Sequence, residues 1–144
     1  MRVIGKEELL EPLNRSALQI AKAVAEDVQK DQEKNLLAGN ISNTNIWDPK
    51  DKDKQNEVRS MFREMIGWSV EEGADFVIGE TFYFAEEAFT ALEEIKKSNW
   101  PAVITISPMV ENIMRDGFSV IDTCKELEQR GADVVGMNCF RGPN

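Results

Sequence analysis

The chain has 144 residues, enough for one domain with a buried core, and its hydrophobic and charged fractions of 42% and 30% are ordinary for a globular protein. Its 26 acidic residues outnumber 17 basic ones, giving a formal net charge of −9; this argues against nucleic acid or an anionic membrane surface as a partner, because both require clustered lysine and arginine. The absence of histidine excludes Ser-His and Cys-His catalytic pairs, histidine-ligated zinc and histidine general bases in this chain.

Targeting signals and cysteine usage indicate the compartment. No apolar run approaches the ~20 residues of a transmembrane helix, and the first residues lack the apolar core of a secretory signal. The two cysteines, Cys124 and Cys139, are not set in a disulfide-like framework, which is typical of a reducing environment. We therefore expect a cytoplasmic protein.

Helical and strand patterns alternate along the chain. The first predicted helix covers Leu13–Lys30 and places Ala17, Ile20, Ala21, Val24 and Val28 on one face. The elements that follow are a strand at Leu36–Ile41, a helix from about Lys54 to Glu72, a strand at Phe76–Gly79, a helix marked by an apolar stripe from Ala85 to Ile95, a strand at Ala102–Ile106, a helix marked by a stripe from Val120 to Leu127, and a strand at Val134–Met137.

This order predicts an α/β fold with parallel strands joined by crossover helices. Ser119 followed by Asp122 resembles a capping box, and Gly73 and Gly131 lie where helices should end. Each of these glycines opens a Gly-Ala-Asp tripeptide before a strand, so the chain repeats a pair of βα units. Such a repeat suits a (β/α) barrel, whose eight units need ~250 residues. A doubly wound sheet of four strands also fits the length, although no nucleotide-binding glycine motif is present.

Candidate site residues lie at the carboxyl ends of the predicted strands, which meet at one edge of a parallel sheet or barrel. They are Asn40, Ser42 and Asn43 after the first strand, Glu80 and Thr81 after the second, Ser107 after the third, and Asn138 and Cys139 after the fourth. From the pattern alone, Glu80 is either a functional carboxylate or a carboxylate paired with a nearby lysine or arginine. Cys139 is either a functional thiol or a small buried hydrophobe.

Other conspicuous side chains are assigned to packing. Cys124 lies on the apolar face of a helix, and the methionine and phenylalanine stripe of the second helix is interpreted as core. The three tryptophans are also interpreted as packing residues, with Trp47 alternatively a lid or a pocket wall.

Three segments of the chain match one family. The run Gly-Ala-Asp-Val-Val-Gly-Met-Asn-Cys at 131–139 resembles the Asn-Cys strand of the homocysteine S-methyltransferases, closest to the betaine–homocysteine methyltransferase branch. Ala-Asp-Phe-Val-Ile-Gly-Glu at 74–80 is similar to the acidic strand of that family, and Ala-Gly-Asn-Ile-Ser-Asn-Thr at 38–44 to its strand with a Gly-x-Ser-x-Thr turn. The resemblance covers nearly all of the chain.

The resemblance implies a zinc enzyme built on a (β/α)8 barrel. Three cysteine thiolates would hold the zinc, the first at Cys139 and the other two an adjacent Cys-Cys pair on the last strand. Glu80 would bind the amino group of homocysteine, with Thr81 and Asn138 as neighbours at the substrate. Zinc would bind the substrate sulfur as a thiolate, which would attack the methyl group of an onium donor such as betaine and give methionine.

Parts of the family pattern are missing. The glycine-rich first strand has no counterpart before Met1, and the Cys-Cys pair would lie beyond Asn144. By position the chain corresponds to the third to sixth strands, so we expect residues 1–144 to form a single partial barrel domain, an internal fragment without activity on its own. A zinc site with one protein thiolate is incomplete, since catalytic zinc sites use three protein ligands.

Two other functions are compatible with the same residues. One is a half-barrel that acts as a binding or assembly module and associates with itself through the open edges of its sheet. The other is a different barrel enzyme in which Glu80 is a base and Cys139 is structural.

Overall fold

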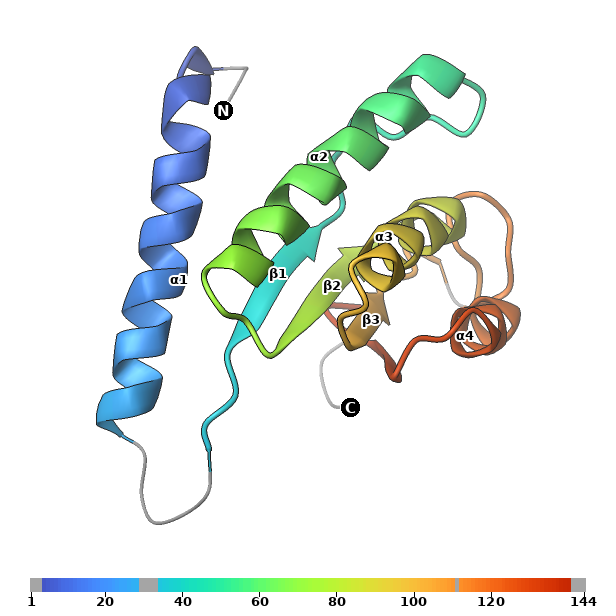
Figure 1. Cartoon of the computed structure of the whole chain (residues 1–144). Coiled ribbons are helices and arrows are strands. Elements are labelled where there is room, and N and C mark those ends of the chain that lie inside the picture. Colours follow the sequence, from blue (N-terminus) through green and yellow to red (C-terminus); the bar gives the residue numbers. More distant parts are fainter. Residues whose placement is uncertain (1–3, 29–33, 111, 141–144) are drawn as a thin grey trace.

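The computed structural model describes residues 4–28, 34–110 and 112–140 and confirms the predicted alternation of helices and strands (Figure 1). The helices are α1 (Leu10–Asp27), α2 (Lys52–Glu71), α3 (Ala85–Lys97) and α4 (Val120–Gln129), and a short 3-10 turn at Glu7–Leu9 leads into α1. The strands are β1 (Ala38–Ser42), β2 (Phe76–Phe82), β3 (Ala102–Ile106) and β4 (Val134–Met137). None of the helices in this part of the chain is long and apolar enough to cross a membrane.

The four strands form one parallel sheet in the order β1-β2-β3-β4. Each strand therefore pairs with the next strand along the chain, as in successive units of a (β/α) barrel. β3 and β4 have the predicted bounds, whereas β2 continues past Gly79 to Phe82. Glu80 and Thr81 consequently belong to the strand and do not follow it, and the β2–β3 register shifts between Gly79 and Phe82.

Local signals in the sequence set the ends of the helices. Ser119 precedes α4, and its hydroxyl accepts a hydrogen bond from the backbone N–H of Asp122, as the predicted cap requires. Asp51 caps α2 in the same way. Gly73 and Gly131 adopt φ values of 86° and 96°, the left-handed conformation that glycine tolerates after a helix.

The hydrophobic core lies between one face of the sheet and α2, α3 and α4. Alternate strand residues point into it, so that Ala102, Ile104 and Ile106 of β3 are fully buried. The Phe82 ring meets the Phe62 ring edge to face at a centroid distance of 6.0 Å. The predicted core stripe of α2 is confirmed, because Val58, Phe62 and Ile66 are buried.

Two glycines of the sheet allow close packing, one between β1 and α2 and the other under the Phe82 ring. A Cβ on Gly39 of β1 would lie 2.4 Å from Cβ of Ser69 on α2. A Cβ on Gly79 of β2 would lie 2.8 Å from the Phe82 ring. Side chains at these positions would force β1 away from α2 or displace the ring, so both glycines are required by packing.

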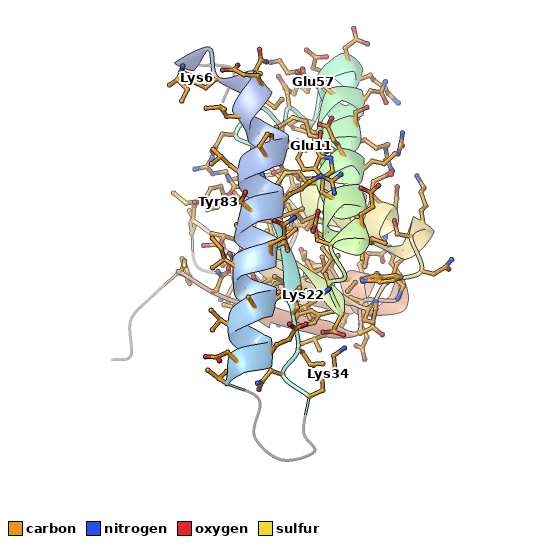
Figure 2. The ribbon with its side chains drawn as sticks, turned by 60° about the vertical axis from the view of Figure 1, so that its left-hand side comes forward. Lys6, Glu11, Lys22, Lys34, Glu57 and Tyr83 are labelled. Carbon is orange, nitrogen blue, oxygen red and sulfur yellow. The ribbon has the colours of Figure 1, made fainter. Side chains whose placement is uncertain are left out.

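The apolar face of α1 is exposed. In an ordinary amphipathic helix this face packs against a core, whereas no part of the described chain covers it here. Figure 2, a view from the α1 side, shows this helix standing at the outer end of the array beside α2. No residue of α1 is buried, and Ile20 and Val24 are 66% and 54% exposed. Polar contacts join α1 to α2: the guanidinium of Arg15 lies 2.6 Å from Glu71 and 3.0 Å from Glu72. The periodicity thus predicts the helix correctly but not its surroundings.

A buried carboxylate fastens α2 to α3. The Glu94 side chain is 1% exposed, and its oxygens accept hydrogen bonds from Lys97 at 2.7 Å, Arg59 at 2.8 Å and Arg63 at 3.1 Å. Burial acts to raise the pKa of Glu94, but the three cationic donors outweigh it and hold that pKa below its usual range. The carboxylate is therefore ionised at neutral pH and belongs to the scaffold.

Candidate functional site

The candidate site lies at the carboxyl edge of the sheet, on the face opposite the helices. Strand alternation turns Gly39, Ile41, Ile104 and Ile106 toward the helices, and it turns their neighbours the other way. Polar side chains from three strands and from the residue after the fourth occupy this opposite face: Asn40, Ser42, Glu80, Thr105 and, directly after β4, Asn138. These side chains form a polar row along the edge of the sheet.

Glu80 is a half-exposed carboxylate held by an amide. Its Oε1 accepts a hydrogen bond of 2.7 Å from Nδ2 of Asn40, and Ser42 lies opposite it in the β1–β2 register. Among the described residues, no lysine or arginine forms an ion pair with Glu80. A carboxylate fixed by an amide is suited to receive an ammonium group from a ligand.

Three side chains are hydrogen-bonded to one another beside Glu80: Thr81 of β2, Thr105 of β3 and Asn138, which follows β4. Nδ2 of Asn138 donates to Oγ1 of Thr81 at 2.7 Å. Oγ1 of Thr105 donates to Oδ1 of Asn138 at 3.0 Å and accepts from the backbone N–H of Thr81 at 3.3 Å. Thr81 and Asn138 are therefore together, as predicted, and Thr105 is a member of the site that sequence reasoning missed.

Cys139 stands at the end of this row. Its thiol is exposed, so the reading of Cys139 as a buried hydrophobe is wrong, and its Sγ lies 3.6 Å from Nδ2 of Asn138. Its backbone has a φ of 55°, the left-handed region. Cys124 is partly buried against the core, as predicted, and burial raises the pKa of its thiol.

The remaining predicted edge residues have other roles. Ser107 is 3% exposed, and its backbone N–H donates to the carbonyl of Phe82, which extends the sheet. The amide of Asn43 donates to Asn45 within its own loop. These two side chains do not join the row.

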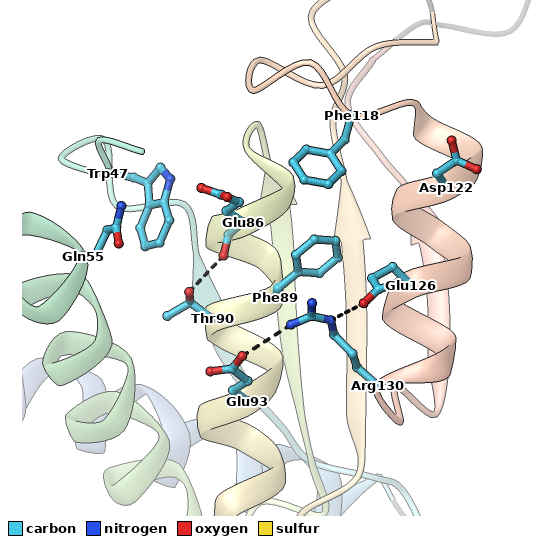
Figure 3. Close-up of a pocket in the computed structure, with 10 residues that line it drawn as sticks. All are labelled: Trp47, Gln55, Glu86, Phe89, Thr90, Glu93, Phe118, Asp122, Glu126 and Arg130. Carbon is cyan, nitrogen blue, oxygen red and sulfur yellow. Dashed lines mark hydrogen bonds and ion pairs between the residues drawn. The ribbon is translucent and has the colours of Figure 1, made fainter. Parts of the chain in front are cut away.

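Trp47 is a pocket wall, but of a groove on the helix side of the sheet. The groove has a volume of about 480 Å³ and is lined by residues of α2, α3 and α4 (Figure 3). Arg130 lies over the Phe89 ring there and pairs with Glu126 at 2.8 Å. Trp47 is buried, and its Nε1 has no hydrogen-bond partner among the described residues. The groove lies on the helix-covered side, away from Glu80 and Cys139.

The described residues do not form a complete metal site. They include no group of three cysteine, aspartate, glutamate or histidine side chains placed to hold an ion. Cys139 offers one thiolate, whereas a catalytic zinc site uses three protein ligands. The donor set present here therefore does not fit zinc without ligands from elsewhere.

A second buried carboxylate supports the loop after β1. The side chain of Glu87, near the start of α3, is 1% exposed. It accepts hydrogen bonds from the backbone N–H and the hydroxyl of Thr44 at 2.8 and 2.7 Å. Burial raises the pKa of Glu87, and the two bonds from Thr44 oppose that rise only in part.

The raised pKa predicts a pH-dependent penalty at Glu87. A carboxyl whose folded pKa exceeds its unfolded value contributes stability below the unfolded pKa of about 4.5, and this contribution is lost as the pH rises through the folded pKa. We expect Glu87→Gln to raise the free energy of unfolding relative to the parent at pH 7, with the gain shrinking toward pH 4. Urea titrations across this range measure it. Glu86→Gln, which neutralises the adjacent and more exposed carboxylate, is the control, and an equal gain at both pH values would contradict the prediction.

The chain is similar to known proteins over nearly its whole length. A sequence model described as Homocysteine S-methyltransferase matches residues 2–144. The chain is 31% identical over 137 residues to the S-methylmethionine–homocysteine S-methyltransferase BHMT2 of Pongo abelii, with 95% of this chain and 36% of that protein covered. It is also 31% identical over 131 residues to betaine–homocysteine S-methyltransferase 1 of Xenopus laevis, with 91% of this chain and 30% of that protein covered.

A solved structure agrees on the fold. The crystal structure of the apo form of the homocysteine methyltransferase MmuM from Escherichia coli superposes with a TM-score of 0.78 at 16% sequence identity. The match covers 94% of this chain and 52% of that one, so four parallel βα units correspond to part of a larger (β/α) barrel. The chain spans about a third of the length of the two curated relatives.

Proposed function

Because this chain belongs to the homocysteine S-methyltransferase family, we propose that it is part of a zinc-dependent enzyme that transfers a methyl group from an onium donor such as betaine to homocysteine, forming methionine. The observation that supports this most directly is the row at the sheet edge, in which the half-exposed Glu80 and the exposed Cys139 lie on either side of Thr81 and Asn138. Free thiols suit a reducing compartment, and we place the reaction in the cytoplasm.

The proposed reaction needs a sulfur nucleophile and a positively charged leaving group. The thiolate of homocysteine bonds to the methyl carbon, and the onium nitrogen or sulfur takes the electron pair of the broken bond and becomes neutral. The thiolate, and not the thiol, is the nucleophile, so the substrate must be held deprotonated and in line with the donor.

Glu80 is proposed to hold the substrate by its α-ammonium group. The bond from Asn40 fixes one carboxylate oxygen of Glu80 and leaves the other oxygen for the ligand. A charge-assisted hydrogen bond of this kind is worth about 1.5–3 kcal/mol, or roughly a 10- to 150-fold change in affinity.

Cys139 is proposed as one of three thiolate ligands of zinc. Its single thiol does not form a site, so the other two ligands must come from polypeptide outside the described residues. We therefore propose that the 144-residue chain does not turn over on its own, although its sheet edge binds homocysteine weakly.

The expected result for Glu80→Gln is loss of homocysteine binding by the purified chain. Titration of reduced L-homocysteine, followed by amide chemical shifts, should give a millimolar Kd for the parent and a Kd roughly 10- to 150-fold higher for the variant. Glu64→Gln, which removes an exposed carboxylate from α2, should bind like the parent. The analogue 4-sulfanylbutanoate lacks the amino group of homocysteine. Its Kd should therefore be the same for Glu80→Gln and for the parent.

Two outcomes would contradict the proposal. If the parent and Glu80→Gln bind homocysteine equally, Glu80 is not the ammonium anchor. If the 144-residue chain binds one zinc per molecule tightly, and methylates homocysteine without further polypeptide, the requirement for outside ligands is wrong. The parent and Cys139→Ser should instead bind zinc equally weakly in a competition with a chelating dye.

A further inference from the structure

The hydroxyl of Thr105 occupies the centre of the hydrogen bonds at the sheet edge. It has one proton, which it donates to Oδ1 of Asn138, and its lone pairs accept the backbone N–H of Thr81. Thr105 therefore connects the strand that carries Glu80 with the residue that precedes Cys139. No other side chain in the described part of the chain has hydrogen bonds to both Thr81 and Asn138.

The hydrogen bonds give the amide of Asn138 a defined orientation. Its Oδ1 accepts the proton of the Thr105 hydroxyl, which itself accepts from the backbone N–H of Thr81. Nδ2 is then directed to Oγ1 of Thr81 at 2.7 Å and to Sγ of Cys139 at 3.6 Å.

Two unusual backbone conformations lie beside these hydrogen bonds. Thr81 has a φ of 65° and Cys139 a φ of 55°, and side chains with a Cβ rarely adopt this region, least of all a β-branched one. Such conformations persist when the surroundings over-determine them. Around Thr81 and Cys139 those surroundings are the register shift of β2 and the hydrogen bonds of Thr105 and Asn138.

We propose that Thr105 is a positioning residue for Cys139, acting through the Asn138 amide to fix where the thiol stands at the edge of the sheet. Without the Thr105 hydroxyl, Asn138 loses the donor to its Oδ1, Thr81 loses the acceptor for its N–H, and Cys139 relaxes toward an extended backbone that moves its Sγ. This role of Thr105 rests on the proposed function in one respect, because it takes Cys139 to be the functional thiol.

The test compares Thr105→Val with Thr105→Ser in the 144-residue chain. Valine keeps the shape of threonine without the hydroxyl, and serine keeps the hydroxyl. Nuclear magnetic resonance should show the side-chain amide protons of Asn138 and the backbone N–H of Thr81 exchanging with water roughly five- to tenfold faster in Thr105→Val, as expected for one lost hydrogen bond. The Cβ and amide resonances of Cys139 should move toward extended-backbone values in the same variant, while Thr105→Ser should match the parent.

A matched control separates positioning from general destabilisation. Thr90→Val removes a threonine hydroxyl elsewhere in the fold, a buried one that donates to the carbonyl of Glu86 on α3, and should leave the resonances of Asn138 and Cys139 unchanged. If Thr105→Val also leaves them unchanged, or if Thr90→Val shifts them equally, Thr105 does not position the thiol. These readouts require no ligand, so a failure of homocysteine binding at Glu80 would contradict the proposed function without affecting this result.

Discussion

Replacing Gly39 with alanine should lower the free energy of unfolding by about 1–3 kcal/mol, the usual effect of overpacking a core. The added Cβ would stand 2.4 Å from Cβ and 2.5 Å from Oγ of Ser69 on α2. Neither atom can swing clear, because Cβ is fixed to the helix backbone and Oγ donates to the carbonyl of Met65 at 2.9 Å. β1 and α2 would have to separate, and β1 carries Asn40 of the candidate site.

A double-mutant cycle makes this prediction specific. Ser69→Gly removes both obstructing atoms, so Gly39→Ala should cost much less in that background than in the parent. Ser69→Ala removes Oγ but keeps Cβ, so in that background Gly39→Ala should still cost nearly as much stability as in the parent. Urea unfolding followed by circular dichroism measures all of these variants. Additive effects of Gly39→Ala and Ser69→Gly would show that close approach of β1 to α2 is not the cause.

Replacing Phe82 with alanine should cost about 3–5 kcal/mol, the range for deleting a large aromatic side chain from a core. Phe82 is fully buried, and its ring fills the space over Gly79 and meets the Phe62 ring at right angles. A domain of this size has only about 5–15 kcal/mol of stability in total, so the variant should be close to unfolding at 37 °C.

Thermal and urea unfolding check this prediction, with Phe118→Ala as the control. Phe118 also meets another phenylalanine edge to face, at 5.9 Å from Phe89, but it is 39% exposed. Its truncation should therefore cost much less. Equal losses for the two variants would mean that burial of Phe82 does not decide its contribution.

The fold was predictable where apolar runs have clear limits. Ala102–Ile106 follows Pro101 and is uninterrupted, and β3 has these bounds in the structure. β2 was predicted too short because Glu80 and Thr81 are polar and resemble a loop, although they continue the strand through a register shift. For α1 the 3.6-residue period identified the helix, but periodicity carries no information about what lies against the apolar face.

Part of the candidate site could be predicted because the carboxyl ends of parallel strands lie at one edge of the sheet. That rule placed Asn40 with Glu80, and Thr81 with Asn138 and Cys139. Thr105 was missed because one threonine between two isoleucines reads as an ordinary strand residue. Its position in the strand could have revealed it. Side chains alternate between the two faces of a strand, so a residue between the buried Ile104 and Ile106 must face the other way.

Glu87 was missed for a different reason. An acidic residue in the first turn of a helix is favourable through the helix dipole alone, and the sequence gives no sign that the residue is buried. Its partner, Thr44, comes from a loop far away in the chain, so only the folded structure brings the two together.

From the uncovered position of α1 we expect this helix and the rest of the chain to unfold as two thermodynamic units. The sheet with α2, α3 and α4 is held mainly by apolar burial and by the buried ion pairs of Glu94, which salt screens little, whereas the link between Arg15 and the end of α2 is more exposed and is screened by salt. Raising the ionic strength should therefore release α1 before the rest unfolds, and amide hydrogen exchange would record it as a low-energy opening of its own. On this expectation, a free energy of unfolding measured for the chain describes the sheet and its three covering helices, and α1 should show a separate equilibrium with its own salt dependence.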